Sequence, residues 1–295
     1  MQFDKNFVSI HAYLCADGYV IKNPKTQKQK YYRIGFRNTN AVLLKDFQEK
    51  FEKVFRIKPR LAVGQRCEIG SKEIYEKLTK EFGSFYSYEW TAPQISKKLS
   101  KTWLRSFFDC EGWVFCKTHQ NRHIGLDSVN EKGLNEIIKM LNNLGIKTIK
   151  KINFKRKMYR VFIYGKENIN KFEEEIGFLH PDKSKKIKET IKDFMVYIWN
   201  FPKHEKEVKN FVKKIMHEKA KIKHEKYIRI ISKERINLER LKEHLGKYFK
   251  VNSLLYSRMN GIGNRYYELD INKKKEVQRL IKLNIIPNTF KLKKS

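Results

Sequence analysis

The sequence has few acidic residues, few cysteines and no long apolar run. Its 295 residues include 65 Lys and Arg but only 32 Asp and Glu, which gives a formal net charge of +33. A lysine-rich genome explains about a third of this excess and still leaves a strongly basic protein. Such a charge repels itself in a lone compact fold and indicates a polyanionic partner, chiefly nucleic acid.

The scarcity of cysteine and of long apolar runs indicates the cellular compartment of the protein. The four cysteines, Cys15, Cys67, Cys110 and Cys116, have no zinc-ligand spacing and are typical of a reducing compartment. The N-terminal MQFDKNFVSI has no signal-peptide pattern, and the longest uncharged apolar stretch, 194–202, is too short to span a bilayer. We therefore expect a soluble, cytoplasmic chain without a membrane partner.

Against this background, one short pattern occurs twice. Ile10–Gly18 reads IHAYLCADG and Leu104–Gly112 reads LRSFFDCEG. Each nonapeptide opens on an aliphatic residue and ends in a small residue, an acid and a glycine. Two copies at domain-sized spacing favour a duplicated unit over two unrelated helix ends.

The elements predicted after each nonapeptide support duplication. Helical and alternating patterns predict the order α-β-α-β-β-α in each of two units. A β-α-β-β-α order recurs after Tyr227, although the helix before it lacks the acid–glycine end. The fold class predicted is α+β, with two αβαββα repeats and a degenerate βαββα unit. The predicted domains are residues 1–92, 93–200 and 201–295.

The nonapeptides also predict how the repeats meet. Small residues four apart lie on one helical face and allow two helices to approach closely; these are Ala12 and Ala16 in one copy and Ser106 and Cys110 in the other. Paired helices would bring Asp17 and Glu111 together at their C-terminal ends, where like charge and the helix dipole are both unfavourable. A divalent cation relieves both problems. The residues therefore predict a basic, metal-dependent nuclease.

The two stretches IHAYLCADGYV and LRSFFDCEGWV resemble the signature of the LAGLIDADG homing endonucleases, in the single-chain form with two motifs. The resemblance covers about residues 5–195. Residues 176–183 resemble the I-G-F-x-x-x-x-K segment that closes a repeat in that family, and residues 88–93 resemble the linker of archaeal members.

The resemblance implies a saddle whose two sheets lie in successive major grooves of double-stranded DNA. It implies a monomer that makes Mg²⁺-dependent double-strand cuts in a long target, with short 3′ overhangs; Mn²⁺ is an alternative cofactor. Asp17 and Glu111 carry over as metal-binding catalytic acids, one for each strand cut, and Lys183 carries over as the catalytic basic residue near the scissile phosphate. The first repeat lacks a lysine at the matching place, for which Lys97 or Lys98 is a candidate.

Polar side chains on saddle strands face the groove, where Arg and Asn read base edges and Lys more often meets phosphate. The predicted DNA-binding residues are Tyr31, Arg33, Arg37, Asn38, Lys151, Asn153, Lys155, Arg160, Arg258 and Arg265. The last two belong to the third unit, which we interpret as an added DNA-binding module. A docking domain that only stabilises the fold is the alternative for that unit.

Three functions remain open from the sequence. The first is a homing endonuclease that mobilises its own coding element, as in intron homing. The second is a maturase that binds intron RNA on the same scaffold, and the third is a DNA-binding regulator that does not cut. The acids in both motifs favour cleavage. An intein is disfavoured because the chain starts at Met1 and ends KLKKS without a His-Asn splice end.

Overall fold

The computed structural model describes residues 3–24, 26–28, 31–118, 121–192, 194, 196–223, 227–261 and 263–286. The chain divides into two compact units, Met1–Phe194 and Met195–Ser295, and each is described on its own. Each unit has a separate hydrophobic core. In the described part of the chain, no helix is long and apolar enough to cross a membrane.

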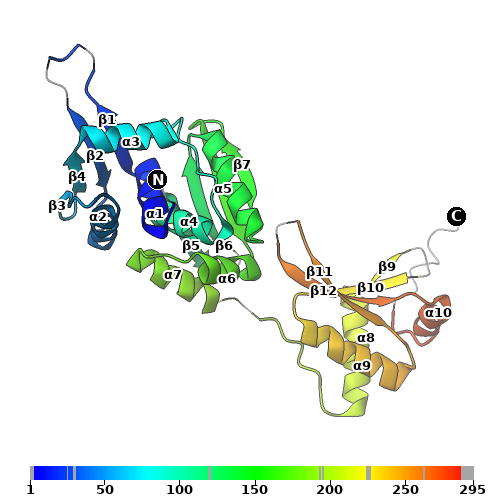
Figure 1. Ribbon diagram of the computed structural model, residues 1–295. Coiled ribbons are helices and arrows are strands. Elements are labelled where there is room, and N and C mark those ends of the chain that lie inside the picture. The colour runs from blue at the N-terminus through cyan, green and yellow to red at the C-terminus, as the bar shows by residue number, and fades with distance from the viewer. Residues whose placement is uncertain are drawn as a thin grey trace. The chain divides into compact units, whose positions relative to one another are not determined.

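The first unit begins with a repeat of three helices and four strands (Figure 1). In chain order these are α1 (Lys5–Ala16), β1 (Gly18–Lys22), β2 (Tyr32–Arg37), α2 (Ala41–Phe55), β3 (Arg60–Ala62), β4 (Arg66–Gly70) and α3 (Lys72–Phe82). The strands form an antiparallel sheet in the order β1-β2-β4-β3, which we call the first sheet. Side chains cap all three helices: Asp4, Asn40 and Ser71 each accept a hydrogen bond from the first turn.

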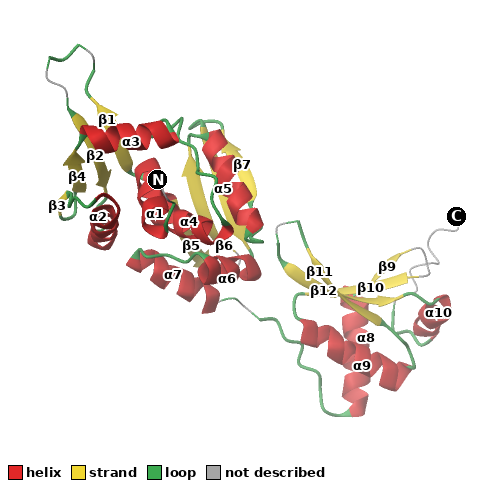
Figure 2. Ribbon diagram, in the orientation of Figure 1, coloured by secondary structure: helices red, strands yellow, loops and turns green. Residues whose placement is uncertain are grey.

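The second repeat has the same order of elements and one further helix. It contains α4 (Lys97–Glu111), β5 (Gly112–Thr118), β6 (Asn121–Ser128), α5 (Glu131–Asn143), β7 (Ile149–Asn153), β8 (Met158–Tyr164), α6 (Lys166–Glu175) and α7 (Pro181–Lys192). The second sheet has the order β5-β6-β8-β7, which matches the first sheet strand for strand. Figure 2 shows the two sheets with helices packed between and beside them.

The α+β class with repeated units is confirmed, but each repeat has the order αββαββα. The prediction missed β1 and β5, the strands that start at the glycine of each nonapeptide. Both strands follow their helix without a loop, so no turn residues mark where helical spacing gives way to alternation.

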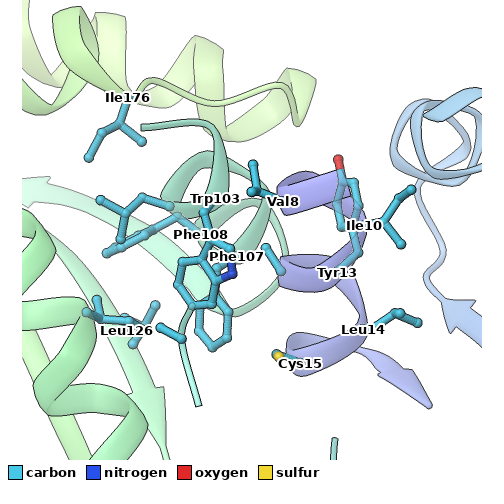
Figure 3. Packing of buried hydrophobic residues seen from close by; sticks show 14 of the residues in the cluster. Val8, Ile10, Tyr13, Leu14, Cys15, Trp103, Phe107, Phe108, Leu126 and Ile176 are labelled. Atoms are coloured by element: carbon cyan, nitrogen blue, oxygen red, sulfur yellow. The ribbon is translucent and has the colours of Figure 1, made fainter. Parts of the chain in front are cut away.

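The two motif helices meet along a seam of small side chains at the centre of the first unit. The Ser9 and Ser106 hydroxyl oxygens lie 2.6 Å apart across it, and Ala12 is fully buried. The bulky residues point the other way, as predicted: Tyr13 toward the first repeat and Phe108 toward the second (Figure 3). Tyr13 packs on Phe36 and Phe47, and Phe108 packs on Phe172, so each motif helix also contributes to the core of its own repeat.

The second unit contains a third αββαββα set. Its elements are α8 (Glu205–Lys219), β9 (Lys221–Lys223), β10 (Tyr227–Ser232), α9 (Arg235–Phe249), β11 (Leu254–Met259), β12 (Arg265–Ile271) and α10 (Lys274–Lys282). The third sheet has the order β9-β10-β12-β11, the same as the other two. The prediction omitted β9 because it extended the preceding helix to Lys221. Ile262, in the turn predicted between β11 and β12, lies outside the described residues.

Candidate metal and nucleic-acid site

The glycine of each motif is required by close approach to the helix before it. A Cβ on Gly18 would lie 2.4 Å from the Leu14 Cα, and a Cβ on Gly112 would lie 2.7 Å from the Phe108 carbonyl oxygen. Neither glycine has a positive φ. The chain therefore turns from helix to strand against the last helical turn, and the acid before each glycine stays at the helix end.

Asp17 caps the C-terminal end of α1 and is held on the side of the first repeat. The Asn38 amide donates to its carboxylate at 3.0 Å, and the backbone N–H of Arg37 donates to its carbonyl oxygen at 3.1 Å. Burial raises the pKa of Asp17, although hydrogen bonds from Asn38 and from the Cys110 thiol and the charge of Lys183 oppose the rise. Cys110 belongs to the second motif, so the seam brings that motif into contact with the first acid.

Glu111 is the last residue of α4 and interacts electrostatically with Asp17. Burial, then the charge of Asp17, raises its pKa to about 7, with a smaller contribution from Asp127 and an opposing one from Lys183. The charge of Asp17 thus disfavours ionisation of Glu111. The structure places both predicted acids in one partly buried site.

Lys183 lies beside these acids at the end of α4. Its ammonium donates to the carbonyl oxygens of Phe108, Asp109 and Cys110 at 3.2, 2.6 and 3.1 Å. These groups belong to the helix end, where the Phe108 carbonyl also accepts the N–H of the capping Gly112, and those of Asp109 and Cys110 have no partner within the helix. Burial lowers the pKa of Lys183, and nearby acids, including Asp17 and Glu111, oppose the change.

Asp109 holds the segment that precedes Lys183 in place through hydrogen bonds. This role was not predicted from the sequence. The Asp109 Oδ1 accepts the backbone N–H groups of Leu179 and His180, both at 2.9 Å. Burial raises its pKa to about 6, against those hydrogen bonds and the charge of Lys183. Asp109 is visible in the second nonapeptide, beside Cys110. Its role could not be predicted because its partner Leu179 lies 70 residues further along the chain.

Lys97 and Lys98 do not replace the lysine that the first repeat lacks. Both lie in the first turn of the 15-residue helix α4, and such a helix is about 20 Å long. They are therefore at the opposite end from Glu111.

The acid pair fits a hard divalent cation. Two carboxylates with raised pKa values lie together, and a cation would stabilise their ionised form. Among the described residues, no group of three or more His, Cys, Asp or Glu side chains is arranged to hold a metal. Remaining ligands would be water and substrate phosphate, which is the usual arrangement for Mg²⁺.

The predicted DNA-binding residues of the first repeat lie in two places: on the first sheet and beside the acid Asp17. Arg33 and Arg37 lie on the face of the first sheet opposite the core, which we call its open face. The Arg33 guanidinium lies 4.9 Å from the ring centre of Tyr31, which directly precedes β2, and that of Arg37 lies 5.2 Å from the ring of Tyr19. Asn38 instead bonds to Asp17.

The register shows two arginines that the sequence reading omitted. Arg66 pairs with Arg37 across β2 and β4, and Arg60 pairs with Glu68 across β3 and β4. Directly opposite residues share a face, so both arginines lie on the open face. Alternation in the two short strands around Gly64 could have identified them.

In the second repeat, Lys151, Asn153 and Arg160 lie on the open face of the second sheet. Arg160 Nε lies 3.0 Å from an Asp127 carboxylate oxygen. Lys155 is exposed in the turn between β7 and β8.

In the third unit, an ion-pair network covers the open face. Arg258 Nε lies 3.3 Å from Glu268, and Arg229 is 3.1 Å from Glu268 and 3.0 Å from Asp270. Both acids are nearly buried, and Arg265 is exposed at the start of β12. The predicted absence of an acid–glycine end is observed: Ala220 and Lys221 follow α8.

The paired motif helices, with an acid at each C-terminal end and a four-stranded sheet after each, form a duplicated unit. Residues 99–177 match the family model described as a LAGLIDADG-like domain. This match confirms the resemblance noted from the nonapeptides, and it lies within the second repeat.

Two curated relatives show sequence similarity over most of this chain. A DNA polymerase of Thermococcus aggregans is 25% identical over 189 residues, which are 63% of this chain and 9% of that protein. The replication factor C small subunit of Methanocaldococcus jannaschii is 28% identical over 190 residues, 60% of this chain and 10% of the relative. The chain therefore spans about a tenth of the length of each.

Solved structures with a similar arrangement include homing endonucleases. Mesophilic variants of I-DmoI align with a TM-score of 0.47 and 18% identity, over 62% of this chain and 99% of theirs. I-WcaI bound to its DNA recognition sequence aligns with a TM-score of 0.43 and 14% identity, over 67% of this chain and 89% of its own.

Proposed function

We propose that the protein is a site-specific homing endonuclease that makes Mg²⁺-dependent double-strand cuts in a long DNA target and leaves short 3′ overhangs. The observation that carries the proposal is the electrostatic coupling of Asp17 and Glu111 at the ends of two packed helices. Residues 1–92 and 93–200 would act as the two DNA-reading repeats, in a monomer, and residues 201–295 as an added module.

In this proposal Asp17 and Glu111 hold the cation, which would lower the charge of the scissile phosphate and favour attack by water. Asn38 orients the Asp17 carboxylate through its amide. Lys183 supplies positive charge beside both acids and is itself held by three carbonyl oxygens. The exposed arginines of the first sheet and Lys151 and Lys155 of the second repeat would contact DNA.

The test is cleavage of a plasmid that carries the gene's flanking sequences joined as if the coding element were absent. Wild type with Mg²⁺ should linearise it, whereas Asp17→Asn and Glu111→Gln should lower linearisation on the order of a hundredfold or more. Glu174→Gln is the matched control, because Glu174 is exposed on α6.

Two results would contradict the proposal. Cleavage that survives in both acid variants would remove these acids from the site. Tight binding without cleavage by wild type would favour the non-cutting regulator, or the maturase if the RNA of the host intron is bound better.

A further inference from the structure

The open face of the second sheet is aromatic. Strand register places the aromatic side chains of three strands on it: Trp113 and Phe115 from β5, His123 from β6, and Phe162 and Tyr164 from β8. Ring centres lie 5.0 Å apart for Phe115 and His123, 5.2 Å for His123 and Phe162, and 5.5 Å for Phe162 and Tyr164. These rings form a continuous surface.

This surface is separate from the hydrophobic core. The core side of the same strands is formed by Val114, Ile124, Leu126, Val161 and Ile163, and the five open-face rings do not belong to that cluster. Trp113, Phe115, Phe162 and Tyr164 keep part of their surface accessible. These four rings therefore lie outside the packed interior.

The first sheet carries different chemistry at the matching positions. The two sheets can be aligned through the pairs Tyr19–Gly35 and Trp113–Gly125, each of which follows its motif glycine. A Cβ on either paired glycine would lie within 2.5 Å of the opposite ring, so each ring lies flat across its sheet.

From that alignment, Arg33 occupies the place of His123, and Glu68 that of Phe162. Arg37 corresponds to Asp127. The first open face is therefore rich in arginine and the second in aromatic rings.

The chemistry of duplex DNA offers a partner for each face. Arginine pairs with guanine and with phosphate, whereas the thymine methyl group is the main apolar feature of the major groove. Lys151 lies at the edge of the aromatic surface, its ammonium 5.4 Å from the ring centre of Phe162. A cationic edge beside an apolar surface fits a phosphate backbone beside methyl-bearing bases.

We infer that the second repeat recognises thymine methyl groups in duplex DNA through Phe115, Phe162 and Tyr164, whereas the first repeat recognises guanine and phosphate through its arginines. This inference rests on the proposed function. It makes the two halves of the target unequal in composition: the half read by the second repeat is rich in A·T pairs.

The experiment measures binding of the full chain to its target duplex after thymine is replaced by uracil in one half at a time. Uracil removes the methyl group and keeps pairing and charge. Affinity should fall about fourfold for each methyl group contacted in one half and by less than twofold in the other. In the Phe162→Ala variant, uracil in the sensitive half should no longer lower the affinity. If Phe162→Ala folds poorly, Phe115→Ala replaces it in the same measurement.

Arg33→Ala is the matched control from the first sheet and should keep the full response to uracil. Equal responses in both halves, or no response despite tight binding, would overturn the inference and leave the nuclease proposal intact. A single-stranded oligonucleotide that competes better than duplex would also overturn it, because the rings would then be stacking on unpaired bases. Failure to bind any duplex would instead overturn the proposed function.

Discussion

At the scale of single residues, the site is a group of charges held in partly buried positions. Glu111 and Asp109 are both easier to protonate than an exposed carboxyl group, with pKa values raised to about 7 and about 6, chiefly by burial. Lys183 compensates part of this negative charge while it bonds to the end of α4. The same few side chains therefore contribute to local stability and, under the proposed function, would also determine metal affinity.

The raised pKa of Glu111 predicts how stability changes with pH. The folded chain binds this proton more tightly than the unfolded chain, whose carboxyl has its ordinary value near 4.5. The contribution of Glu111 to stability is therefore complete below about pH 4.5 and is lost as pH rises to about 7, on the order of 3 kcal/mol. Glu111→Gln should remove that loss, as measured by urea unfolding without metal between pH 4.5 and 8. Glu174→Gln should follow wild type, and parallel curves for all three proteins would contradict the assignment.

Lys183 should be important for folding as well as for any chemistry. Lys183→Met leaves carbonyl oxygens of Phe108, Asp109 and Cys110 without their charged donor, so the free energy of unfolding should fall by about 2 kcal/mol. Urea unfolding measures this loss. Lys185→Met, an exposed substitution on the same helix α7, should cost less than about 0.5 kcal/mol. Equal stability of the two variants would show that the three bonds contribute nothing.

The sequence predicted Asp17, Glu111 and Lys183 as a group because repeated spacing and a family signature both point to them. It did not predict Asp109 as a positioning residue or Asn38 as a partner of Asp17. Those roles depend on contacts between segments 70 and 21 residues apart. Such contacts are determined by tertiary packing, and tertiary packing produces no periodic pattern in the sequence that could reveal them.

At the scale of elements, the helices were easier to predict than the strands. Caps and apolar spacing located α2, α3 and α5 to within about a residue. The strands β1, β5 and β9 start within two residues of a helix end, and β9 has only three residues. The alternation in so short a segment is too brief to distinguish from the end of a helix.

The glycines beneath the open-face rings give a prediction at this scale. In Gly125→Ala the new Cβ would meet the Trp113 ring at 2.2 Å, so the ring must move and unfolding should become easier by about 1–3 kcal/mol. Gly246→Ala is the matched control: it lies inside helix α9 with nothing within 4 Å, and should stabilise the second unit by about 0.5–1 kcal/mol. Thermal unfolding followed by circular dichroism measures both. A neutral Gly125→Ala would show that the ring has room to shift.

At the scale of the whole molecule, the chain contains two cores that share no residue. The first extends from Phe7 to Ile187 and the second from Val208 to Ile286. The third αββαββα set repeats the sheet order of the others but has no acid at the matching helix end. Duplication of architecture thus extends further along the chain than duplication of the motif acids.

Separate cores predict separate stabilities. Calorimetry of the full chain should show two transitions, and a chain shortened to residues 1–200 should keep the first-unit transition and the cleavage activity. If residues 201–295 bind DNA, the shortened chain should protect a shorter footprint and show a smaller dependence of affinity on salt. An unchanged footprint and salt dependence would instead support a stabilising role for the third unit.

The seam between α1 and α4 has a consequence for exchanging repeats between related proteins. Ser9 and Ser106 meet across it, and the Lys50 ammonium donates to Ser9 from the first repeat. A transplanted second repeat with a larger residue at position 106 would push the two helix ends apart and separate the acids that they carry. A hybrid of this kind must therefore take both helices of the seam from a single parent, while the strands proposed to contact DNA are free to come from another.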